Sequence, residues 1–296
     1  METACFSTAL VRSSTLAARF SGVIRRVLLD AFGTVFSPAR PVVAQYAEVA
    51  RSHGIVVGEA RVGDSFKRAF KRWIKLHPLY GKHSNPPLEP GDWWRGVIGD
   101  TFRSAGVSQH MYDSVEDSLS TALIERFWGP QGYSLHCEFP AFLKALDSLH
   151  LPPPAIVSNT DPALFKILDN LGVSTRTLGK TGIEPADIFT TWSLEKEKHE
   201  VEFWHDVLER LNANLEGSES LKPEEVLVVG DELVADYETP RQAGFQSLLL
   251  RRASAQVAHD NPSYVDEIDG RKVSVHAVED LMQAISWIEG KNETNS

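Results

Sequence analysis

The chain contains little cysteine and no long apolar runs. Only Cys5 and Cys137 occur among its 296 residues, which excludes a framework of disulfides and a cluster of thiolate metal ligands. This cysteine content is typical of a reducing compartment, and any metal is expected to bind through oxygen or histidine. No apolar run has the length of a membrane span or resembles the core of a secretory signal, so we expect a protein that neither crosses a membrane nor is secreted.

An excess of positive charge is also lacking. The formal net charge is −10, which argues against nucleic acid or an anionic membrane surface as the main partner, because both bind a basic face. With 42% hydrophobic and 24% charged residues, the composition is that of a globular protein with one large domain or two smaller ones. No pattern in the sequence defines an oligomeric state.

Acidic residues are nearly absent from residues 1–26, where Glu2 is the only one. Arg12, Arg19 and Arg26 recur at equal spacing and would form a basic stripe on an amphipathic helix. This pattern is typical of a mitochondrial transit peptide, and a disordered tail explains it equally well. The two readings place the protein in the mitochondrion or in the cytoplasm.

A short apolar run at residues 27–29 ends in a carboxylate, Asp30, and is broken at Gly33. Its length and composition predict a strand that is buried on both faces. Asp30 would then lie at the carboxyl end of a strand, where open parallel sheets bind ligands. A carboxylate in that place can act as a nucleophile, although Asp also commonly forms turns after strands.

Residues 38–132 carry apolar side chains at steps of three and four, which predicts an inserted helical domain. The concentration of tryptophan there indicates the core of a small bundle rather than the lining of a substrate pocket; the residues are Trp73, Trp93, Trp94 and Trp128. The loop at residues 77–87 contains more polar and reactive side chains than a connection needs, namely His77, Tyr80, Lys82 and His83. The sequence does not show which of these four faces a ligand.

Strand and helix patterns alternate after residue 132. Apolar runs at residues 155–158, 187–191, 226–230 and 247–250 predict further strands, and amphipathic segments at 139–149, 163–171 and 203–211 predict helices. This alternation predicts an α/β fold with a doubly wound parallel sheet. The core would comprise residues 27–37 and 133–290.

Polar side chains follow several of the predicted strands. Ser158, Asn159 and Asp161 follow the second strand, Lys198 lies beyond the third, and Asp231 and Asp236 follow the fourth. Because the carboxyl ends of parallel strands meet at one edge of the sheet, we expect these groups to lie near Asp30. Helix N-capping is the alternative for Asp231 and Asp236, and a solvated charged run is the alternative for Lys198.

With these motifs in this order, the chain resembles the haloacid dehalogenase superfamily of hydrolases, in the branch with a helical cap inserted after the first motif. It is also similar to eukaryotic haloacid dehalogenase-like hydrolase domain-containing proteins. The resemblance implies that Asp30 is the nucleophile, that Ser158 and Asn159 hold the transferred group with a lysine, and that residues 32–34 contact the substrate. It further implies one Mg²⁺, bound by Asp30, Asp231 and the Phe32 carbonyl with Asp236 nearby, since hard cations prefer oxygen ligands.

Two departures from the pattern affect the expected activity. Phe32 stands where phosphatases of this superfamily carry a second Asp, which protonates the leaving group. The third motif is altered as well, so that Lys198 and Lys196 are rival candidates for its lysine. Without the acid, we expect substrates with weakly basic leaving groups to react best.

Three functions fit these observations. The first is a Mg²⁺-dependent, phosphatase-type hydrolase that acts on a small phosphorylated or otherwise activated substrate through an intermediate on Asp30. The second is a catalytically impaired binding or scaffold protein, which Phe32 and the altered third motif favour. The third is a 2-haloacid dehalogenase, which Asp231 disfavours because those enzymes lack the metal-binding Asp.

Overall fold

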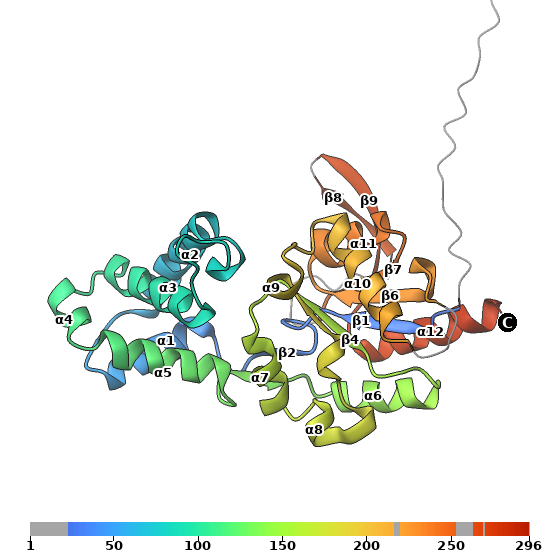
Figure 1. Ribbon diagram of the computed structural model, residues 1–296, viewed down its shortest axis with the longest axis horizontal. Coiled ribbons are helices and arrows are strands. Elements are labelled where there is room, and N and C mark those ends of the chain that lie inside the picture. The colour runs from blue at the N-terminus through green and yellow to red at the C-terminus, as the bar shows by residue number, and fades with distance from the viewer. Residues whose placement is uncertain (1–22, 216–219, 253–262, 269, 296) are drawn as a thin grey trace, which may run out of the picture.

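The computed structural model describes residues 23–215, 220–252, 263–268 and 270–295. Its larger domain is built on a seven-stranded sheet in the order β5-β4-β1-β6-β7-β9-β8 (Figure 1). Every pairing in this sheet is parallel except that between β8 and β9. The strands are β1 (Arg26–Leu29), β4 (Ala155–Ser158), β5 (Ile188–Thr190), β6 (Val226–Gly230), β7 (Gln246–Leu250), β8 (Ser263–Ile268) and β9 (Arg271–Val278). The predicted α/β class with a parallel sheet is confirmed.

Successive residues of β1 pack on opposite faces of the sheet. Val27 and Leu29 belong to the apolar cluster beneath α6 (Phe139–Ser148), α7 (Ala163–Asn170) and α12 (Leu281–Asn295), whereas Leu28 belongs to the cluster beneath α10 (Val201–Ala213). Both faces of the strand are thus covered, which is why it consists of apolar residues without alternation. The predicted helices correspond to α6, α7 and α10.

The inserted domain contains five α-helices, and it lies on the left of Figure 1. They are α1 (Val42–Ser52), α2 (Glu59–Leu76), α3 (Pro90–Ser104), α4 (Gln109–Asp113) and α5 (Glu116–Trp128), with a 3-10 turn η1 (Leu79–Gly81). Two short antiparallel strands, β2 (Phe36–Pro38) and β3 (Tyr133–Leu135), pair where the chain enters and leaves this domain. These helices have a core of their own, in which Trp93 and Phe102 are fully buried.

The remaining elements are short. They are α8 (Thr175–Leu178), η2 (Gly179–Thr181), η3 (Pro185–Asp187), α9 (Thr191–Leu194), η4 (Pro223–Glu225), the π-helical turn η5 (Leu233–Glu238) and α11 (Thr239–Gln242). Within the described ranges, no helix has both the length and the apolar character that a membrane span requires.

The amino-terminal boundary of the core differs from the sequence-based one. Ile24 is buried in the core, Arg25 is hydrogen-bonded through its backbone to Glu225, and Arg26 begins β1 and pairs with Asp187 at 2.7 Å. A leader that extended to residue 26 would therefore include part of the sheet, so that boundary lies too late in the chain. The rest of the proposed transit peptide, residues 1–22, lies outside the described residues.

Candidate active site

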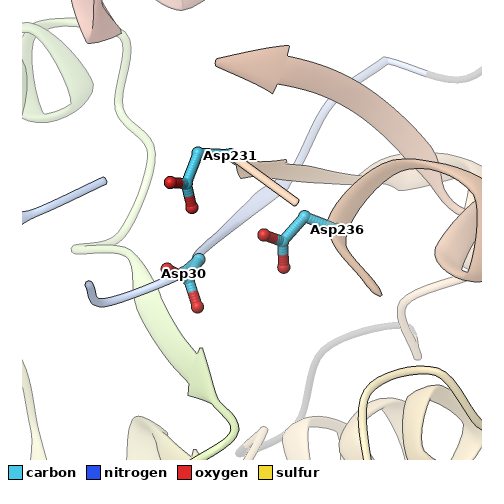
Figure 2. Close-up of side chains that lie close together, drawn as sticks. All are labelled: Asp30, Asp231 and Asp236. Carbon is cyan, nitrogen blue, oxygen red and sulfur yellow. The ribbon is translucent and has the colours of Figure 1, made fainter. Parts of the chain in front are cut away.

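Three carboxylates converge at the carboxyl ends of β1 and β6 (Figure 2). Asp30 follows β1 and Asp231 follows β6, and these two strands pair directly, with Leu29 opposite Val229. Asp236 lies in η5, one turn further along the chain. Each carboxylate offers an oxygen within 4.8 Å of the others. The parallel register therefore unites residues that are far apart in the sequence.

Two glycines make this close approach sterically feasible. A Cβ atom on Gly33, which has a φ of +81°, would lie 2.4 Å from a carboxylate oxygen of Asp231. A Cβ atom on Gly230 would lie 2.3 Å from the carboxyl carbon of Asp236. Any larger residue at either position would displace a site carboxylate.

Lys198 is the cation of the site. Its Nζ lies 2.5 Å from Asp30 Oδ1 and also forms an ion pair with Asp236, and the side chain is only 2% exposed. Its backbone is fixed on both sides, because its amide donates to Asn159 Oδ1 at 3.0 Å and its carbonyl accepts from Trp204 Nε1 at 2.8 Å. The rival Lys196 pairs instead with Asp206 at 2.5 Å.

The electrostatics of the site are those of an acidic cluster with one internal cation. Burial, together with the charges of Asp236 and Asp231, raises the pKa of Asp30 to about 8 even though Lys198 opposes the shift. Burial and the charge of Asp236 also raise the pKa of Asp231. Although burial disfavours its charge, Lys198 has a raised pKa because Asp236 and Asp30 stabilise the ammonium ion.

The donor set fits a hard divalent cation. The cluster holds three carboxylates, and one ammonium group, that of Lys198, pairs with two of them, so the cluster retains negative charge when all are ionised. Carboxylate oxygens from Asp30 and Asp231, with Asp236 beside them, are ligands that Mg²⁺ prefers. Asp236 also accepts a hydrogen bond from the Glu232 amide at 3.0 Å, so it forms a local backbone contact as well as the pair with Lys198.

A pocket of about 260 Å³ opens in front of Asp30. Ser158, Asn159 and Lys198 line it from the core, and Tyr80 and Trp94 line it from the inserted domain. Phe32 also lines it and is packed edge-on against Phe36 and Tyr133. The expected set Asp30, Phe32, Ser158, Asn159 and Lys198 is therefore gathered around one space.

Gly33 and Thr34 do not line this pocket. Gly33 packs against Asp231, and Thr34 is fully buried. The positions of these two residues therefore do not support the expectation that they contact the substrate. They shape the loop after Asp30 instead.

Two arginines that the sequence analysis did not single out brace the site. Arg252 donates to the carbonyl oxygens of Gly33 at 3.1 Å and Thr34 at 2.7 Å and pairs with Glu138. Arg251 donates to the Asp231 carbonyl. Both directly follow β7, so the rule that polar groups at strand ends converge would have identified them.

The polar loop of the inserted domain contacts the core beside Lys198. The Tyr80 hydroxyl donates to the Asn159 carbonyl at 2.9 Å, and Lys82 pairs with Glu195 at 2.7 Å. His83 also contacts Glu195, at 3.1 Å, whereas His77 is bonded within its own domain to Ser84. Of the four candidates, Tyr80 is the one that lines the pocket.

The tryptophan interpretation is confirmed for Trp93, which belongs to an apolar cluster of the inserted domain, and for Trp73 and Trp94, which pack against that cluster. Trp93 is fully buried in the core of the inserted domain. Trp94 also lines a cavity between that domain and the core, as Trp128 does, and Trp94 Nε1 donates to Asp161 at 2.7 Å. Helical periodicity shows that a face is apolar but does not show whether it packs on its own domain or borders a cavity.

Comparison with known proteins agrees with this geometry. A family model described as haloacid dehalogenase-like hydrolase matches residues 24–244. The chain is 29% identical over 236 residues to haloacid dehalogenase-like hydrolase domain-containing protein 3 of Danio rerio, covering 80% of this chain and 88% of that protein.

Solved structures show the same fold. A crystal structure of the hydrolase YfnB from Bacillus subtilis bound to magnesium has a TM-score of 0.57 at 15% identity, covering 90% of this chain and 99% of that one. The defluorinating L-2-haloacid dehalogenase Rha0230 has a TM-score of 0.59 at 17% identity, with 90% and 95% covered. Because the family model spans most of the chain and includes Asp30, Lys198 and Asp231, the protein belongs to the haloacid dehalogenase-like hydrolases.

Proposed function

We propose that this hydrolase is a Mg²⁺-dependent enzyme of the phosphatase type, acting on a small phosphorylated or otherwise activated molecule. The observation that carries the proposal is the contact between Asp30 and Lys198, 2.5 Å apart, in the wall of a pocket that Ser158 also lines. A nucleophilic carboxylate, a cation and a hydroxyl donor in one space are the groups that phosphoryl transfer requires.

Each residue has a defined part in this reaction. An Asp30 carboxylate oxygen attacks phosphorus, and the bond from phosphorus to the leaving oxygen breaks with its electron pair on that oxygen. Ser158 and Lys198 donate to the phosphoryl oxygens and offset their charge. Water then attacks the aspartyl phosphate, which releases inorganic phosphate and restores Asp30.

Mg²⁺ held by Asp30 and Asp231 would neutralise charge on the phosphoryl group. Asp231 would bind the ion through its charged carboxylate. Position 32 would bind it only through its backbone carbonyl, which every residue has. Phe32 therefore removes a proton donor without removing a metal ligand.

The proposal is tested by phosphate release from a panel of acetyl phosphate, aryl phosphates and alkyl phosphates, with a 2-haloacid assayed for halide release. We expect Mg²⁺-dependent turnover of acetyl phosphate that is lost in Asp30→Asn. Turnover of the haloacid alone would favour a dehalogenase. No turnover of any compound would favour a binding or scaffold protein.

Metal binding has its own measurement. Mg²⁺ at millimolar concentration should raise the melting temperature of the wild-type protein, because a ligand that binds only the folded state stabilises it. The shift should disappear in Asp231→Ala and persist in Glu238→Ala, since Glu238 pairs with Arg271 outside the carboxylate cluster. Absence of magnesium binding to the wild-type protein would contradict the metal-dependent mechanism.

A further inference from the structure

A second cavity, of about 340 Å³, adjoins the pocket in front of Asp30. Aromatic side chains form much of its wall, namely Phe32, Tyr46, Phe66, Trp94, Phe127, Trp128 and Tyr133. Lys67 and Asp161 are the charged residues among those that line it. Asp161 is held in place by the Trp94 indole at 2.7 Å and by the Ala163 amide at 2.7 Å. The cavity is therefore built for an apolar occupant.

The cavity and the Asp30 pocket share part of their walls. Phe32, Trp94, Tyr133 and Thr160 line both spaces. The Phe32 ring lies 4.7 Å from Phe36 and 5.4 Å from Tyr133, centroid to centroid, in edge-to-face contacts. These contacts hold the ring as a fixed apolar surface that runs from the reaction centre into the cavity.

We propose that this cavity binds the leaving group of the substrate and that this group is aromatic. The inference rests on the proposed phosphatase function and names its substrate class as aryl phosphates. A cavity of about 150 Å³ is large enough for benzene, so this larger one has room for a two-ring group. Aromatic walls favour an aromatic occupant because edge-to-face and stacked contacts add to the burial of apolar area.

The chemistry of the site and its shape both favour aryl phosphates as substrates. The structure offers no carboxylic acid at position 32, so the leaving oxygen departs with its electron pair and without a proton from that position. An aryl oxide tolerates this far better than an alkoxide because it is less basic. Phe32 thus contributes to specificity twice, by excluding basic leaving groups and by contacting the aromatic ring.

The test compares two substrates that differ in size but have leaving groups of similar basicity, phenyl phosphate and 2-naphthyl phosphate. We expect kcat/KM for 2-naphthyl phosphate to be at least about tenfold higher, because even one methylene group in an apolar pocket changes this quantity by about tenfold or more. Acetyl phosphate, whose acyl group is too small to fill the cavity, reports on the phosphoryl-transfer chemistry alone.

Variants that fill the cavity provide the matched comparison. Ile124→Trp, and Val43→Phe as a second variant if the first fails to fold, should reduce the preference for the naphthyl ester to near unity while acetyl phosphate turnover persists. Both residues line the cavity. Ile74→Trp is the control, since Ile74 is 42% exposed on α2 and outside the cavity lining, and it should retain the wild-type preference.

The outcomes separate the two proposals. Turnover of acetyl phosphate without a preference for the naphthyl ester, or a preference that survives both filling variants, would overturn the inference and leave the phosphatase function intact. No turnover of any phosphate compound would overturn the function and the inference with it.

Discussion

Lys198 Nζ lies 2.5 Å from Asp30 Oδ1, although the two residues are separated by 168 positions in the chain. The contact joins the end of β1 to the segment that follows β5 and α9, so it exists only when the sheet is assembled. The same ammonium group pairs with Asp236. One cation therefore organises two of the three carboxylates of the site.

Replacing this cation is expected to reduce activity strongly. Lys198→Met should lower kcat/KM for acetyl phosphate by about 10²- to 10³-fold, which is the usual effect of removing one charge-stabilising donor from a transition state. Lys196→Met is the matched control, because Lys196 pairs with Asp206 at 2.5 Å instead of with the site. If the two variants lose activity equally, Lys198 has no special role in the reaction.

The stability of the metal-free protein should fall as the pH rises from about 4 to 8. Asp30 has an ordinary pKa of 3.8 that burial raises to about 8 in the folded protein, so between these values the folded state binds more protons than the unfolded state. The free energy of unfolding then decreases with pH across that window. Urea denaturation in the presence of a chelator measures it, and Asp30→Asn should show a shallower dependence. An equally steep decrease in the variant would assign the effect to other groups.

Restoring an acid at position 32 should change the range of substrates. We expect Phe32→Asp to raise kcat/KM for alkyl phosphates selectively, by up to about 10²- to 10⁴-fold, because general-acid assistance helps basic leaving groups most. Phosphate release from glycerol phosphate measures the gain, and acetyl phosphate serves as the insensitive reference. If the variant folds and binds Mg²⁺ but gains no alkyl phosphatase activity, the remaining groups of the site are not competent for attack, and a binding function becomes the better explanation.

The arginine-rich start of the chain should direct a reporter to mitochondria. A fusion of residues 1–26 is expected to be imported and cleaved, because the spaced arginines and scarcity of acids are typical of transit peptides. Cleavage should fall before Ile24, since Ile24 is buried in the core. Microscopy and sequencing of the mature amino terminus test this, and a reporter that stays diffuse in the cytosol would contradict it.

Much of the fold was accessible from the sequence because its strands are short apolar runs followed by polar residues. Residues 155–158 and 226–230 were predicted to be strands and form β4 and β6. The positions of Asp30, Ser158 and Asp231 follow from the rule that the ends of parallel strands meet at one edge.

Other elements could not be predicted because their stability depends on distant partners. β2 and β3 have three residues each and pair Phe36 with Leu135, so neither has a periodicity of its own. β9 begins with exposed charged residues, and it is part of the sheet because Leu249 of β7 pairs with Ala277. The choice between Lys196 and Lys198 likewise depends on how the chain turns at Glu195, which has a φ of +58°.

The aromatic cavity that adjoins the Asp30 pocket takes its walls from two domains, with Tyr46 on the inserted one and Ile167 on the core. The cavity exists only while the two domains are in contact. A molecule that fills it therefore binds the protein with its domains together and has no comparable affinity for the protein with its domains apart. By population shift, the occupant itself would then favour closure. A substrate too small to contact both walls would not stabilise the closed arrangement. Its rate of turnover would then depend on the equilibrium between open and closed forms as well as on the chemistry at phosphorus.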